Sequence, residues 1–238
     1  MDVHVEQNKN PIKTINPDIT LSIDPELKQR APNLKLGVVL ASVVVEPKND
    51  SLWLELSKAG AAAAQALGSE GALASTPAIA AAREAYKACG KEPSRYRVSS
   101  EALIRRVING KSLYRINSVV DVNNLISIES RNSVGVYDFD KIQGEAIFRI
   151  GKPGENYNGI GKETINIEGL PVFSDNLGPF GSPTSDSQRS MVTQDTRKIM
   201  LVIIAFGGDL ELSKHIARTE EKLTEYASAR EIHSSIVT

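Results

Sequence analysis

Apolar residues in the first half of the chain recur at helical spacing, and four helices are predicted there. The spacing between residues 52 and 67, followed by an alanine run, predicts a helix that Gly68 ends. Further helices are expected over 76–89, over 101–108 and from Ser118 onward. The residues expected to cap these four helices are Asp50 or Ser51, Thr76, Ser99 or Ser100, and Ser118.

Strand patterns frame these helices and dominate the second half of the chain. Residues 19–23 alternate, and residues 34–45 form a β-branched run typical of a strand buried on both faces. Later strands, separated by glycine-rich turns, are expected at 146–150, 164–167, 171–174 and 199–206. This order predicts an α+β fold in which N-terminal helices pack on a curved, mostly antiparallel sheet or partial barrel.

The ends of the chain differ from its middle. Residues 1–17 have no periodicity and are expected to form a flexible tail, whereas residues 18–238 are expected to form a single domain. Within that domain the motif-bearing core spans 90–206. Charged and apolar residues recur at helical spacing from about 209 to 230, which predicts a C-terminal amphipathic helix.

Composition narrows the classes of protein that the chain can belong to. Of its 238 residues, 41% are hydrophobic and 24% charged, and no apolar run is long enough to span a bilayer. The polar, acidic start differs from a signal peptide, so a cytoplasmic protein without membrane contact is expected. A single cysteine, Cys89, excludes an internal disulfide framework and a cysteine-based zinc site, and we expect neither a metal nor a cofactor.

Charge is distributed unevenly although the net charge is only -1. Between Arg83 and Arg115 there are nine basic residues and three acidic ones. This local excess fits either a surface for a phosphate backbone or a solvated helical face, and charge alone weighs the two equally. The residues predicted to contact RNA are Arg105, Arg106, Lys111 and Arg115.

Two segments some sixty residues apart carry candidate binding groups. In the helix from Ser118, Val119, Val122 and Ile126 form one apolar stripe, which leaves Asn123 and Asn124 on another face. The loop 181–189 crowds hydroxyl and carboxylate side chains between strands. Each segment has a simpler interpretation, because such groups also cap helix ends and turns.

Several motifs resemble the tRNA-editing module of the phenylalanyl-tRNA synthetase beta subunit, and stand-alone proteins built from that module above all. The motifs are Ser-Val-Val-Asp-Val-Asn-Asn at 118–124, Tyr-Asp-Phe-Asp-Lys-Ile at 137–142 and Gly-Glu-Ala-Ile-Phe-Arg at 144–149. Tyr-Arg-Val-Ser-Ser-Glu-Ala-Leu at 96–103 and Gly-Ser-Pro-Thr-Ser-Asp-Ser at 181–187 complete the pattern. The similarity covers roughly residues 90–206.

This resemblance implies binding of a tRNA acceptor end and hydrolysis of a wrongly attached amino acid. The family removes tyrosine from phenylalanine tRNA, which requires a positioned water and a polarised carbonyl. The chain carries Gly135 in place of the family histidine and Gln188 near the family glutamate, so the catalytic residues are not predicted. The predicted substrate-binding residues are Arg97, Ser99, Asn123, Asn124, Tyr137, Thr184, Ser185, Asp186, Ser187 and Gln188.

A second hypothesis belongs to another class of protein. The three histidines, His4, His215 and His233, all lie near the termini, so the motif region lacks an imidazole for acid–base chemistry. The chain could therefore be a module that binds RNA or an amino acid without cleaving an ester. Which amino acid or tRNA is bound, and the oligomeric state, do not follow from the sequence.

Overall fold

A computed structural model describes residues 20–161 and 163–238. The predicted tail, residues 1–17, lies outside the described residues. The central sheet is antiparallel throughout, with the order β10–β2–β9–β3. Its strands are β2 (Lys35–Ser42), β3 (Ser133–Asp138), β9 (Lys198–Ala205) and β10 (Arg230–Val237).

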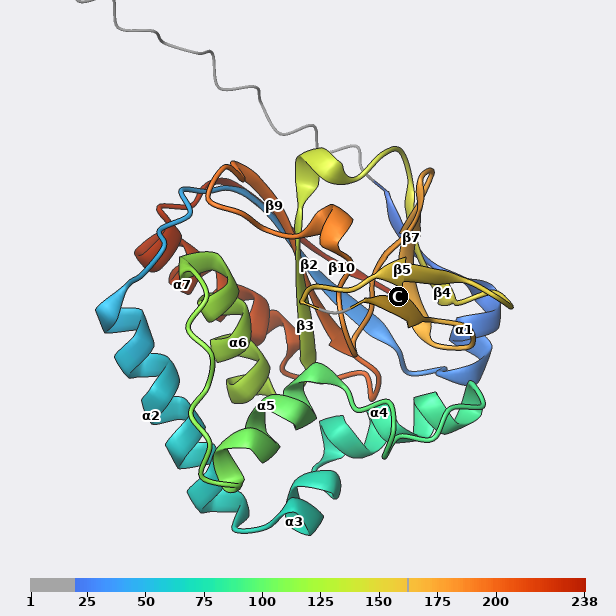
Figure 1. Ribbon diagram of the computed structural model, residues 1–238, viewed down its shortest axis with the longest axis horizontal. Helices are drawn as coiled ribbons and strands as arrows, with labels where there is room; N and C mark the ends of the chain where they lie inside the picture. Colours follow the sequence, from blue (N-terminus) through green and yellow to red (C-terminus); the bar gives the residue numbers. More distant parts are fainter. Residues whose placement is uncertain (1–19, 162) are drawn as a thin grey trace, which may run out of the picture.

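Helices cover one face of the central sheet, as Figure 1 shows around α6 and α7. Strand residues such as Val39, Val136 and Leu201 share a core there with Leu125 and Leu223 from the helices. This apolar contact explains why the helices form, since burial of one face supplies most helical stability in proteins. The helices of this layer are α2 (Asp50–Leu67), α3 (Glu70–Ala74), α5 (Ser99–Ile108), α6 (Ser118–Ser130) and α7 (Leu212–Ala227).

The opposite face of the central sheet packs against a second sheet of order β1–β4–β7–β8. In this second core Phe148 and Phe173 stack with ring centroids 4.3 Å apart, next to Phe180. Its elements are β1 (Leu21–Ile23), β4 (Ala146–Ile150), β7 (Pro171–Asp175) and β8 (Gly178–Gly181), flanked by α1 (Pro25–Arg30), α4 (Pro77–Ala88), the hairpin β5 (Asn156–Asn158) and β6 (Thr164–Asn166), and the short 3-10 helices η1 (Phe139–Lys141) and η2 (Gln188–Ser190).

This helix–sheet–sheet arrangement confirms the predicted α+β class. All strand pairs but one are antiparallel in the described part of the chain, the exception being β1 with β4. The strands form separate sheets, and none of the described sheets closes into a barrel.

Three expected helix caps were wrong. Asn49 caps α2 and Asn117 caps α6, each one residue before the expected position, because their side-chain oxygens accept the Leu52 and Val120 N–H groups. Helix α5 begins after Val98, which provides no side-chain cap. Gly68, in contrast, ends α2 in the left-handed conformation at φ 66°, as predicted.

The C-terminal helix is shorter than expected, because α7 ends at Ala227 and an eight-residue strand follows. Strand β10 escaped prediction because it lies at the edge of the central sheet and its side chains are mostly exposed. A strand without a buried face lacks the alternating apolar pattern by which strands are recognised.

Candidate functional site

Three buried tyrosines hold the loop formed by residues 182–187, which we call the serine loop. They come from α4, β3 and β5, three elements far apart in the sequence. Because their hydroxyl groups are satisfied by loop atoms, the loop is fixed on the rigid second core. The three contacts are Tyr86 Oη with Thr184 Oγ1 at 2.8 Å, Tyr137 Oη donating to Asp186 Oδ1 at 3.1 Å, and Tyr157 Oη donating to Ser182 Oγ at 3.2 Å.

Two glycines make room for the Tyr137 side chain. A Cβ atom on Gly135 would lie 2.3 Å from the Tyr137 hydroxyl oxygen, and a Cβ on Gly181 would lie 2.3 Å from the ring atom Cε1. Real Cβ atoms essentially never come that close to another heavy atom. The phenol can therefore reach the serine loop only because positions 135 and 181 carry no side chain.

The Asp186 carboxylate is the acidic group at the centre of this arrangement. Its Oδ1 accepts both the Tyr137 hydroxyl and the Ser182 backbone N–H, the latter at 3.3 Å. Its Oδ2 has no hydrogen-bond partner among the described residues, and the side chain is partly exposed. Burial raises the pKa of the Asp186 carboxyl to about 7, although both hydrogen bonds act in the opposite direction.

The N-terminus of α5 joins the serine loop from the other side. The Ser99 N–H donates to the Pro183 carbonyl at 2.7 Å, while the Ser99 hydroxyl is buried and has no partner in residues 20–161 and 163–238. Arg97 lies two residues earlier, and its Nε is likewise buried without a partner, 3.9 Å from Glu101. Ser99 thus contacts the loop directly, although it lies more than eighty residues away along the chain.

The structure thus connects part of the predicted site by hydrogen bonds. Ser187 donates its N–H to the Phe180 carbonyl, and Gln188 is exposed in η2. The predicted residues gathered around the loop are Ser99, Tyr137, Thr184, Ser185, Asp186 and Ser187.

The two predicted asparagines have no described hydrogen bond to the serine loop. Asn123 is buried, donates its side-chain N–H to Asn124 Oδ1 at 3.4 Å and leaves its own Oδ1 without a partner among the described residues. Helix α6, which carries both, packs with the helical layer, whereas the serine loop is attached through Tyr137 to the second core. A shared cavity between α6 and the loop stays a prediction.

Three of the four basic residues predicted to contact RNA already interact with other side chains of the protein. Arg105 pairs with Glu70 at 2.5 Å and Arg115 with Asp50 at 2.6 Å, while the Arg106 guanidinium lies 4.0 Å from the centre of the Tyr114 ring. Lys111 is exposed. The sequence shows the local excess of charge but not these partners, since Asp50 and Glu70 lie outside the counted segment.

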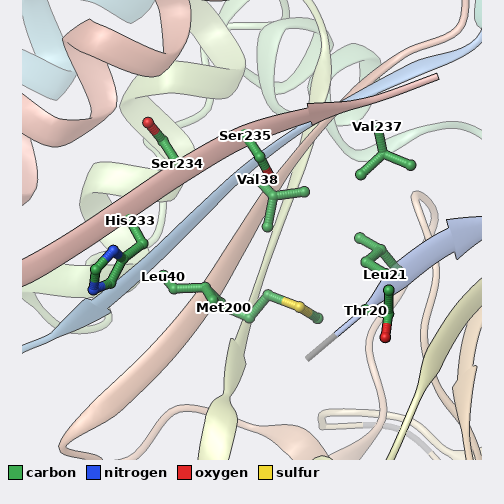
Figure 2. Close-up of a pocket in the computed structure, with 9 residues that line it drawn as sticks. All are labelled: Thr20, Leu21, Val38, Leu40, Met200, His233, Ser234, Ser235 and Val237. Carbon is green, nitrogen blue, oxygen red and sulfur yellow. The ribbon is translucent and has the colours of Figure 1, made fainter. Parts of the chain in front are cut away.

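Two pockets lie away from the serine loop. One, of about 380 Å³, lies between β1, β2, β9 and β10, where Val38, Leu40 and Met200 form an apolar floor beside His233 (Figure 2). The other, of about 610 Å³, contains His215, whose Nε2 lies 3.1 Å from Asp209 Oδ2. None of the residues predicted to bind a substrate lines either pocket.

Comparison with protein families gives a match to the B3/4 domain over residues 81–233. This chain belongs to the B3/4 domain family. The match contains all residues predicted to bind substrate or RNA.

Two individual proteins resemble this B3/4 chain. The phenylalanine–tRNA ligase beta subunit of Psychrobacter arcticus is 31% identical over 87 residues, which cover 36% of this chain and 11% of that subunit. The chain thus aligns with about a tenth of that relative's length. A crystal structure of an N-terminal fragment of the phenylalanyl-tRNA synthetase beta subunit from Pyrococcus horikoshii is 14% identical, with a TM-score of 0.49 over 96% of this chain and 57% of the fragment.

Two further properties concern the described residues of this B3/4 chain alone. Within residues 20–161 and 163–238, none of the helices is long and apolar enough to cross a membrane. The same residues contain no group of three or more histidine, cysteine, aspartate or glutamate side chains placed to hold a metal ion.

Sequence reasoning identified the serine loop but missed the residues that hold it. Tyr86 and Tyr157 occur in segments without a recognisable motif, and their hydroxyls meet the loop only through tertiary packing. Gly135 was noted as a departure from the family histidine, yet its relation to Tyr137 requires coordinates. Alternation along β3 places residues 135 and 137 on the same face, which is the one signal that the sequence offered.

Proposed function

We propose that this chain binds the acceptor end of a tRNA and hydrolyses the ester that joins it to a wrongly attached amino acid. Membership in the B3/4 family and the similarity to a phenylalanine–tRNA ligase beta subunit support a role on tRNA. The observation that carries the proposal is the serine loop, where hydroxyl groups and a carboxylate are held by three tyrosines on a rigid core. Preorganised groups of this kind suit the positioning of a water and a polar substrate.

The proposed chemistry does not require a metal ion. An aminoacyl ester is an activated acyl group, so hydrolysis needs an oriented water, a proton acceptor and donors near the carbonyl oxygen more than a strong nucleophile. The Ser99 hydroxyl, which has no hydrogen-bond partner among the described residues and whose backbone N–H binds the loop at Pro183, is the candidate donor there.

We expect the purified chain to release amino acid from at least one mischarged tRNA at a rate well above the uncatalysed hydrolysis. The test uses tRNAs charged with radiolabelled tyrosine, serine, alanine and non-protein amino acids, with acid-precipitable counts followed over time. Heat-denatured protein provides the control for contaminating esterases. Equal rates with and without native protein for every substrate would contradict the proposal.

A non-catalytic binding module is the second candidate. The observation in its favour is that neither of the histidines in the described residues, His215 and His233, lies at the serine loop. Such a module would be stabilised by free amino acids in a thermal-shift assay and would leave every charged tRNA intact.

For RNA binding we expect Lys111 to contribute more than its paired neighbours. Arg105 and Arg115 would have to exchange their carboxylate partners for phosphate, whereas exposed Lys111 would only lose water. Lys111→Gln should weaken tRNA binding and reduce the slope of log K against log salt by about 1. Filter binding at several salt concentrations measures both values. Lys214→Gln, at an exposed position of α7 outside the basic segment, is the control and should leave the slope unchanged.

A further inference from the structure

We infer that Asp186 is the general base of the reaction and that Tyr137 positions it. This inference rests on the proposed hydrolase function and assigns its catalytic residue. The carboxylate is held at one oxygen and free at the other: Oδ1 accepts the Tyr137 hydroxyl at 3.1 Å and the Ser182 N–H at 3.3 Å, whereas Oδ2 has no partner among the described residues. A base needs this combination of a fixed orientation and an available lone pair.

Among the described residues, no cationic side chain lowers the pKa of the Asp186 carboxyl. The groups that face it from α4, β3 and β5 are Tyr86, Tyr137 and Tyr157, and burial raises the pKa of each phenol, so all three stay neutral at physiological pH. Arg189, three residues after Asp186, and Arg97, two residues before Ser99, pair with other carboxylates. Arg189 forms an ion pair with Asp175 at 2.9 Å, and Arg97 lies 3.9 Å from Glu101.

A neutral surrounding makes the carboxylate a stronger base than an exposed one. Burial moves the pKa of Asp186 to about 7, so near neutral pH the group is partly ionised and can accept a proton efficiently. Tyr137 counteracts part of this effect by donating to the ionised form.

The reaction step is the attack of water on the ester carbonyl. Asp186 Oδ2 accepts one proton from the water as its oxygen bonds to the carbonyl carbon and the carbonyl electron pair moves to oxygen. When that pair returns, the bond between carbon and the ribose oxygen breaks, and the protonated Asp186 returns its proton to the leaving oxygen. The products are the free amino acid and the tRNA hydroxyl, with Asp186 regenerated.

Asp186→Asn tests the assignment because the amide keeps the shape of the side chain but cannot take the proton. We expect deacylation to fall by about 100-fold or more, with substrate KM little changed. Above pH 7 the variant should be at least as thermally stable as the natural protein. Because the pKa of Asp186 is raised in the folded state, ionisation of its carboxyl destabilises the fold as pH rises through that pKa. The amide of the variant does not ionise and escapes this loss. Asp195→Asn makes the same chemical change at an exposed position and should retain full activity.

The pH profile of Tyr137→Phe separates a base from a merely structural residue. Without the phenol hydroxyl, the ionised Asp186 carboxylate loses a hydrogen-bond donor and its pKa rises. The acidic limb of the plot of kcat against pH, which lies near pH 7 in the natural protein, should therefore move to higher pH by about one unit. A folded Asp186→Asn variant that keeps its activity, or a Tyr137→Phe variant that is slower without a shifted limb, would overturn the role of Asp186 and leave the hydrolase function standing. A natural protein inactive on every charged tRNA would overturn both.

Discussion

Replacing Glu101 with alanine should lower the free energy of unfolding by about 3 kcal/mol, because it removes a buried carboxylate from between three arginines. The Glu101 side chain is only 1% exposed, and Arg83 Nη1 contacts both of its oxygens, at 3.0 and 3.1 Å. Arg97 and Arg105 approach the same carboxylate at 3.9 and 4.0 Å. Without it, the three positive charges repel each other at the N-terminal half of α5.

Urea unfolding followed by circular dichroism measures this change. The side chain of Arg83 is 24% exposed, so the arginines can turn partly toward water. We therefore expect the loss of unfolding free energy to lie at the lower end of the range for a fully buried ion pair. Glu84→Ala is the matched control: its pair with Lys87 is exposed on α4, and its removal should change the free energy of unfolding by no more than about 0.5 kcal/mol. Equal stability losses in the two variants would show that the arginine cluster around Glu101 contributes nothing.

The helices and strands that were predicted could be recognised because they leave a local pattern in the sequence. The stripe of Val119, Val122 and Ile126 is buried, and the β-branched run at 34–45 contains the buried strand β2. The helix boundaries were less certain, since a cap is decided by one hydrogen bond: Asn117 rather than Ser118 accepts the Val120 N–H. Edge strand β10 left no pattern, because none of its residues is buried.

The loop of the candidate site could be predicted from the sequence, but the tyrosines that hold the loop could not. The crowding of Thr184, Ser185 and Asp186 in a short loop is visible in the sequence, as is the missing imidazole at position 135. The hydroxyls of Tyr86 and Tyr157 reach this loop across 98 and 25 residues of chain, and no local pattern encodes such pairs. Long-range side-chain hydrogen bonds follow from packing of the completed fold.

Gly135→Ala should destabilise the protein by about 1–3 kcal/mol and abolish most of the proposed activity, because it forces Tyr137 out of its place. The new methyl group would lie 2.3 Å from the phenol oxygen and 2.8 Å from Cζ. Tyr137 cannot move away freely, since its ring packs edge-on against Phe173 and Phe180, with centroids 5.6 and 5.0 Å away. Displacement of the ring breaks the hydrogen bond that orients Asp186.

A double-mutant cycle with Tyr137→Phe connects this loss to the phenol. Removing the hydroxyl takes away the closest atom to the new methyl group, so the free-energy losses of Gly135→Ala and Tyr137→Phe should sum to more than the loss in the double variant. Gly71→Ala is the control, because Gly71 is exposed within α3 and an added methyl group there should be neutral or stabilising by up to about 1 kcal/mol. Strictly additive losses at 135 and 137 would mean that the two side chains do not compete for the same space, and the glycine would then have no part in directing Tyr137 toward Asp186.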